Sequence, residues 1–219
     1  MRVHVGDAMR PSLARQIQDM DFVTPRDQGR PIQSLLSREG YAPSPEFNRL
    51  HGARRLLFVD DPRHRHIDVF VGSFEMCHVL PLSERLDLEP ITVPLAELLM
   101  TKLQIVKLNR KDMLDVYALL LAHGMGDHDR DTINALRIAL VAGADWGLFH
   151  TIDLNLTRLR EGSSQFDLST TDQATIAARL DALAAALERQ PKSLRWTFRA
   201  RVGERLPWYD EPEEVGRQV

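Results

Sequence analysis

The 219-residue sequence contains a single cysteine, Cys77, and little excess charge of either sign. One cysteine cannot form an internal disulfide, and no Cys/His cluster has the spacing of a zinc site. With 28 basic and 31 acidic side chains the net charge is −3, so any contact with a polyanion must be local. No apolar run approaches the roughly 18 residues of a membrane helix, and residues 1–15 lack the apolar core of a secretory signal. These absences predict a soluble, cytoplasmic protein without membrane association.

Several familiar catalytic signatures are also missing. The sequence has no Gly-x-Ser-x-Gly, no P-loop and no Gly-x-Gly-x-x-Gly motif. The adjacent Cys77 and His78 would face opposite ways on a strand, which favours a core cysteine over a Cys-His nucleophile. His64 and His66 lack a third ligand at a suitable spacing, so a polar turn is favoured over a transition-metal site.

Apolar periodicity predicts an α+β fold in which a small mixed sheet, flanked by helices, is followed by a helical C-terminal region. We divide the chain into an α+β core over residues 1–124 and a C-terminal region over residues 125–219 with a basic segment and an acidic tail. Asn109 is expected to cap a helix that Gly124 closes. The predicted strands are 17–23, 54–59 and 66–71, the last two forming a hairpin; the predicted helices are 26–39, 94–106, 111–123, 131–142 and 172–189; residues 41–50 are predicted to be a loop.

Three aspartates on predicted strands could carry chemistry. Asp19 and Asp21 are separated by one residue, so a strand would place both on one face, with Met20 and Phe22 facing the core. Asp68 lies inside a strongly apolar strand, where a carboxylate needs a partner or a metal to offset its desolvation. Close carboxylates repel unless a cation joins them, and Mg²⁺ prefers oxygen ligands. A pair of solvated carboxylates on a strand face remains the alternative.

The order of these features resembles the nucleotidyltransferase superfamily. Within it, the sequence is similar to the minimal bacterial nucleotidyltransferases that include AbiEii-like abortive-infection toxins. The resemblance covers roughly residues 1–124 and depends most on the stretch from Lys102 to Asp115. The segments that carry it are Gln18-Asp19-Met20-Asp21-Phe22-Val23, His66-Ile67-Asp68-Val69-Phe70, Val93-Pro94-Leu95 through Lys102-Leu103-Gln104, and Arg110-Lys111-Asp112-Met113-Leu114-Asp115.

The resemblance implies a role for each matching position. Asp19, Asp21 and Asp68 would bind Mg²⁺, and Asp68 would also act on the attacking hydroxyl. Lys102 would be catalytic and contact the nucleotide, and Lys111 would contact the nucleotide. The family has a glycine turn before its aspartate pair, and Gly6 is the nearest glycine here, so it would contact the phosphates. The implied site residues are therefore Gly6, Asp19, Asp21, Asp68, Lys102 and Lys111.

The implied activity is Mg²⁺-dependent transfer of a nucleoside monophosphate from an NTP to a hydroxyl of RNA, a protein or a small molecule. One alternative is a non-catalytic member whose phosphate-binding turn is degenerate or missing. Another is a metal-dependent phosphodiesterase that uses the same carboxylates. Lys102 could instead be a surface lysine, and Asp112 and Asp115 could simply favour the helix dipole.

The basic segment of the C-terminal region points to RNA as a candidate acceptor. Residues 189–205 hold six basic side chains and one acid, with Trp196 and Phe198 interleaved. Cations contact phosphates and aromatic rings stack on bases in complexes with nucleic-acid strands. The alternative is a basic helix that packs on the core or on the acidic tail.

Overall fold

The computed structural model describes residues 2–6, 9–16 and 19–212 of the chain. Packing divides the chain into two compact units. The sheet unit consists of residues 16–75 and 79–93, and the helical unit consists of residues 1–15, 76–78 and 94–219. The units do not follow the sequence-based boundary at residue 124, because the helices over 95–103 and 110–122 pack with later helices.

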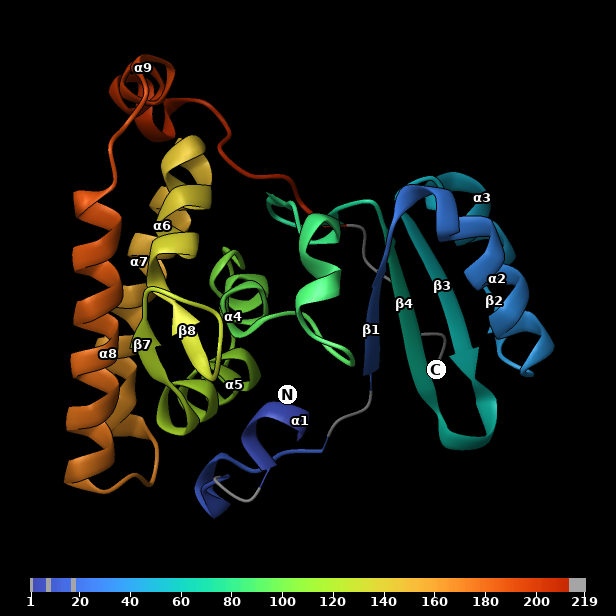
Figure 1. Cartoon of the computed structure of the whole chain (residues 1–219), viewed down its shortest axis with the longest axis horizontal. Coiled ribbons are helices and arrows are strands. Elements are labelled where there is room, and N and C mark those ends of the chain that lie inside the picture. The colour runs from blue at the N-terminus through green and yellow to red at the C-terminus, as the bar shows by residue number, and fades with distance from the viewer. Residues whose placement is uncertain (1, 7–8, 17–18, 213–219) are drawn as a thin grey trace. The chain divides into compact units, whose positions relative to one another are not determined.

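The sheet unit is built on a mixed four-stranded sheet with the strand order β1-β4-β3-β2 (Figure 1). β1 pairs in parallel with β4, whereas β3 pairs antiparallel with both β4 and β2. The predicted hairpin is confirmed, and its turn passes through His64 with a φ of +50°. The elements of this unit are β1 (Asp19–Thr24), α2 (Gly29–Arg38), β2 (Ala42–Pro43), α3 (Pro45–His51), β3 (Arg55–Asp60), β4 (Arg65–Val71), β5 (Phe74–Glu75) and β6 (Val79–Leu80).

One face of the sheet forms the apolar core with α2. In this core, every second side chain of β3 and β4 packs with Ile32 and Leu36 of α2. Met20 of β1 also packs against the core. Phe22 was expected to share this core, but it is 43% exposed because β1 is the outermost strand of the sheet. The strand side chains of the core are Leu56, Phe58, Ile67, Val69 and Val71.

The prediction of a loop over residues 41–50 is wrong. This stretch contains the short strand β2 and the helix α3. Ser44 stands before Pro45 at the first helical position, which is the usual arrangement at a helix start. The Asn48 side chain then fixes α3 to β3, because it accepts from the Leu57 N–H and donates to the Leu57 carbonyl.

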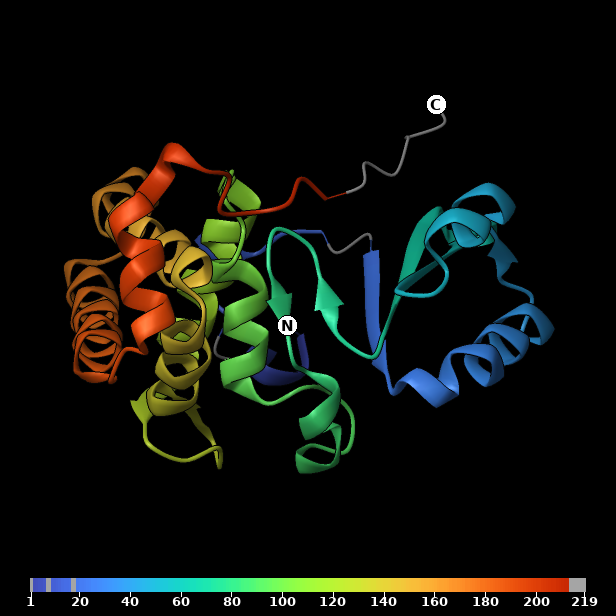
Figure 2. The ribbon, with the colours of Figure 1, turned by 90° about the horizontal axis from the view of Figure 1, so that it is seen from above.

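Over its described residues the helical unit contains six longer helices, α4 to α9. Figures 1 and 2 show how they are arranged within the unit. α8 packs against α5, α6 and α7 through the predicted stripe of Ile176, Leu180, Leu183 and Leu187, all of which are buried. The elements of this unit are α1 (Arg2–Val5), α4 (Leu95–Leu103), α5 (Arg110–Ala122), β7 (Gly124–Gly126), β8 (Thr132–Asn134), α6 (Ala135–Ala144), α7 (Trp146–Gly162), α8 (Thr170–Arg189) and α9 (Leu194–Val202).

Several helix boundaries in this unit differ from the prediction, and the helix expected over 94–106 ends at Leu103. The Asn109 side chain caps α5 as expected, but Gly124 begins strand β7 rather than closing the helix. The helix predicted over 131–142 begins only at Ala135, because residues 132–134 pair with β7 and Asn134 then caps α6. The α+β fold class with a helical C-terminal half is nevertheless confirmed. Among the described residues, no helix is both long and apolar enough to cross a membrane.

Candidate functional site

Asp19, Asp21 and Asp68 lie on one face of the sheet. In the parallel pairing of β1 with β4, Asp21 is directly opposite Asp68 and Asp19 is opposite His66. Paired residues of neighbouring strands share a face, as do residues two apart on one strand. Met20 points to the other face, where α2 packs. Because neighbouring strands are about 4.8 Å apart, Asp21 and Asp68 are within reach of a shared cation.

Asp68 has a charged partner inside the sheet unit. Its side chain is buried, and its Oδ1 accepts a hydrogen bond from Nε of Arg55 at 2.7 Å. Asp19 and Asp21, by contrast, are exposed on the outermost strand. The buried carboxylate was expected to need a partner or a metal, and Arg55 is that partner.

Arg55 was missed by the sequence analysis, although the sequence held a signal. It stands at the start of an apolar strand, and Asp68 stands alone in the next strand of the same hairpin. Opposite charges on two neighbouring buried strands predict an ion pair. Within the described ranges 2–6, 9–16 and 19–212, no three His, Cys, Asp or Glu side chains are grouped so that they could hold a metal ion. The three aspartates therefore share a face without forming an assembled cation site.

Lys102 belongs to a buried charge network in the helical unit. Its ammonium contacts Asp112 of α5 at 3.2 Å and Asp115 of α5 at 3.0 Å. Arg15 donates two hydrogen bonds to Asp115, from Nε at 2.7 Å and from Nη2 at 2.6 Å. The ion pairs of Lys102 with Asp112 and Asp115 thus join α4 to α5. The two aspartates therefore do more than favour the helix dipole.

The network shifts the pKa values of its members. Burial alone would lower the pKa of Lys102, but the charges of Asp115 and Asp112 outweigh it and raise that pKa above its usual value. Burial alone would raise the pKa of Asp115, but Arg15 and Lys102 hold it below its usual range. Lys102 and Asp115 are therefore both charged at neutral pH, and Lys102 is already held by two carboxylates.

The other two residues implied by the resemblance also lie in the helical unit. The Lys111 side chain is exposed in the first turn of α5, where its backbone N–H donates to Asn109. Gly6 follows the single turn of α1 with a φ of +44°, and its carbonyl accepts from the Met9 N–H. Gly6 thus follows a helical turn instead of preceding a helix. Of the implied residues, the sheet unit brings together only the three aspartates.

A second buried polar group lies in the helical unit. Nε2 of His78 is 2.8 Å from the hydroxyl of Thr151, which also accepts a hydrogen bond from the indole N–H of Trp208. Burial lowers the pKa of His78 to about 4, although the negative charges of Asp145 and Asp210 oppose the shift.

This histidine predicts a pH dependence of stability. The folded protein keeps His78 neutral down to about pH 4, whereas the unfolded chain binds the proton near pH 6.5. The free energy of unfolding should therefore fall by up to about 3 kcal/mol between pH 6.5 and pH 4 on account of His78 alone. His78→Gln keeps a hydrogen-bonding side chain beside Thr151 and should flatten this part of the profile in urea denaturation. His64→Asn, which removes an exposed histidine at a positive φ that asparagine tolerates, should leave the profile as it is. Equal slopes for the wild type and His78→Gln would contradict the assignment.

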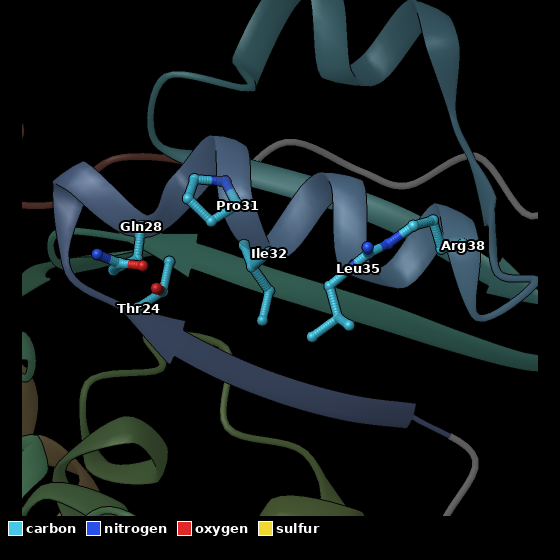
Figure 3. A pocket seen from close by; sticks show the side chains of 6 residues that line it. All are labelled: Thr24, Gln28, Pro31, Ile32, Leu35 and Arg38. Carbon is cyan, nitrogen blue, oxygen red and sulfur yellow. The ribbon is translucent and has the colours of Figure 1, made fainter.

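The sheet unit also has a groove on the face opposite the carboxylates. It has a volume of about 430 Å³ and runs between α2 and the end of β1 (Figure 3). Figure 3 shows Ile32 and Leu35 pointing from α2 toward β1, with Arg38 at one end and Gln28 and Thr24 at the other. The groove shares no lining residue with the carboxylate face, so it adds nothing to the cation site.

The basic segment of residues 189–205 divides into structural and exposed cations. Arg199 donates to the carbonyls of Gly203, Leu206 and Pro207 and lies over the Trp146 ring. Lys192 donates to two carbonyls at the end of α8. Trp196 packs edge-on against Phe149. The exposed members of the segment are Arg189, Arg195, Phe198, Arg201 and Arg205.

Comparisons with known proteins do not assign the chain to a family. The chain matches no protein-family model, no curated protein and no solved structure.

Proposed function

We propose that this protein is a Mg²⁺-dependent nucleotidyltransferase, which moves a nucleoside monophosphate from an NTP to a hydroxyl acceptor and releases pyrophosphate. The observation that carries the proposal is the register of β1 and β4, which puts Asp21 opposite Asp68 and Asp19 on the same face. The resemblance of the sequence to AbiEii-like nucleotidyltransferases supports the same reaction. The proposal rests on the sheet unit alone, since Lys102 is held by Asp112 and Asp115.

The three aspartates suit a hard divalent cation because they supply carboxylate oxygens and lie on one face of the sheet. Carboxylate oxygens are the ligands that Mg²⁺ prefers, and two of the carboxylates are exposed to an incoming nucleotide. Bound Mg²⁺ would neutralise the charge that develops on the attacking and leaving oxygens. Asp19 and Asp21 then serve as ligands, and Asp68 both binds the cation and accepts the proton of the attacking hydroxyl.

The test is incubation with each NTP labelled at the α-phosphate, with Mg²⁺, alone and with total RNA. Labelled acceptor supports the proposal. Breakdown of RNA without added NTP would instead support a phosphodiesterase that uses the same carboxylates. No reaction with any acceptor would favour a non-catalytic binding module, the second candidate, which the Arg55–Asp68 ion pair supports because that pair neutralises Asp68 without a metal.

RNA is the acceptor that the exposed part of the basic segment favours. Phe198 is 63% exposed on α9, and the Arg201 guanidinium lies 5.5 Å from the centre of its ring. Arg195 and Arg205 add exposed positive charge nearby in the sequence. An exposed aromatic ring among arginines suits base stacking together with phosphate contacts.

Replacing Arg195, Arg201 and Arg205 together with glutamine should weaken RNA binding. The slope of log affinity against log salt concentration should become shallower by up to about 0.7 per lost phosphate contact with a single strand. The matched control removes three cations elsewhere in the helical unit, Lys107, Arg130 and Arg160, and should keep both affinity and slope. Filter binding over a salt series measures both quantities. If the two triple variants behave alike, the segment does not bind RNA.

A further inference from the structure

Arg55 is held in an unusually restricted place for an arginine. It is 7% exposed, and its guanidinium carbon lies 5.4 Å from the centre of the Phe47 ring and 5.3 Å from that of the Phe70 ring. Arginine stacks readily on aromatic faces and keeps its charge when buried. The two rings and the hydrogen bond to Asp68 together fix the position of this cation.

The same carboxylate is the one that a metal would need. Asp68 is directly opposite Asp21 on the carboxylate face, and its Oδ1 already accepts from Arg55 at 2.7 Å. A guanidinium and a divalent cation beside one carboxylate repel each other, and burial weakens the solvent screening between them. Coordination through Oδ1 of Asp68 therefore requires that the Arg55 bond lengthen or break.

We propose that Arg55 is the resident counter-ion of Asp68 in the metal-free protein and competes with a divalent cation for it. Arg55 acts through Asp68 and is a positioning residue, and the inference rests on the proposed function in taking Asp68 as a metal ligand. It accounts for the arrangement of the carboxylate face, where the aspartates share a face and the described residues nevertheless form no assembled metal site. The site is completed only when the cation displaces the guanidinium.

A purely structural ion pair makes a different prediction. If Arg55 served only to neutralise a buried carboxylate, its removal would change the stability of the fold and leave metal affinity alone or weaken it. If Arg55 competes with the metal, its removal strengthens metal binding. Metal affinity therefore separates the two roles, and stability does not.

The experiment is a titration of the full chain with Mn²⁺ alone, followed by electron paramagnetic resonance of the free ion. Mn²⁺ accepts the same oxygen ligands as Mg²⁺. Arg55→Met keeps an unbranched side chain between the two rings and should bind Mn²⁺ about tenfold more tightly than the wild type, because a neighbouring positive charge commonly changes the affinity of a carboxylate for a cation such as the proton by at least that factor. The control is Arg54→Met, because Arg54 is the adjacent residue, is exposed, and pairs with Glu75 at 3.3 Å. It should bind Mn²⁺ as the wild type does.

The outcomes separate this inference from the proposed function. Equal or weaker binding by Arg55→Met, with measurable binding by the wild type, would overturn the competition and leave the metal site standing. No binding by the wild type or by any folded variant would overturn both. If Arg55→Met does not fold, Arg55→Lys retains the charge but lacks the Nε–H group that bonds Asp68. Arg55→Lys should then bind Mn²⁺ more tightly than the wild type, and an unchanged Mn²⁺ affinity would overturn the inference.

Discussion

Asp68→Asn should lower nucleotide transfer by about a hundredfold or more, because it removes a metal ligand and the proton acceptor of the attacking hydroxyl together. The substitution preserves the shape of the side chain. It also leaves Arg55 without its carboxylate, so we expect a lower free energy of unfolding as well. Initial rates under saturating NTP, with urea denaturation of the same preparation, measure both effects.

Asp21→Asn separates the loss of nucleotide transfer from the loss of stability that we expect for Asp68→Asn. Asp21 lies opposite Asp68 on the same face but is exposed, so its loss should lower transfer strongly with a small change in stability. The matched control is Asp27→Asn, an exposed carboxylate of the sheet unit outside β1 and β4, which should keep full activity. Unchanged turnover in Asp68→Asn would remove this residue from the mechanism.

Asp115→Ala should lower the free energy of unfolding by about 3–5 kcal/mol, the usual cost of breaking a buried ion pair from one side. The substitution removes the carboxylate that both Arg15 and Lys102 contact, and it leaves Asp112 as a partner of Lys102. The Asp115 side chain is 6% exposed, so water cannot replace the lost carboxylate. Urea denaturation at neutral pH measures the change.

The control for this prediction is an ion pair of the same unit at the surface. Asp181 pairs with Arg160 at 2.7 Å, but its side chain is 68% exposed. Asp181→Ala should change stability by less than about 1 kcal/mol, since exposed pairs contribute little. Similar losses in Asp115→Ala and Asp181→Ala would show that the buried network does not hold α4 to α5.

The carboxylate face was within reach of sequence reasoning because its signals are local. The spacing of Asp19 and Asp21 and the apolar neighbours of Asp68 specify strands and faces directly. The parallel pairing that puts Asp21 opposite Asp68 is different, because strand order and register come from packing between segments far apart in the chain. Local spacing thus predicted the residues of the face but not their pairing.

The residues that sequence reasoning placed less well depend on tertiary partners. The partners of Lys102 could not be predicted, because nothing local shows that it reaches Asp112 and Asp115 across a helix pair. Arg55 was overlooked because its partner is 13 residues away on another strand. The cap at Asn109, by contrast, was predicted correctly, because its hydrogen bonds reach only the backbone of the next three residues.

The central claim is tested most directly by following two labels of one NTP in a single reaction. The full chain is incubated with Mg²⁺, total RNA and NTP that carries either an α-phosphate or a γ-phosphate label. Our account predicts that the α-label appears on an acceptor while the γ-label appears only in pyrophosphate, because the transferred group is the nucleoside monophosphate. Transfer of the γ-label to an acceptor, or no transfer of either label by the folded protein, would contradict it.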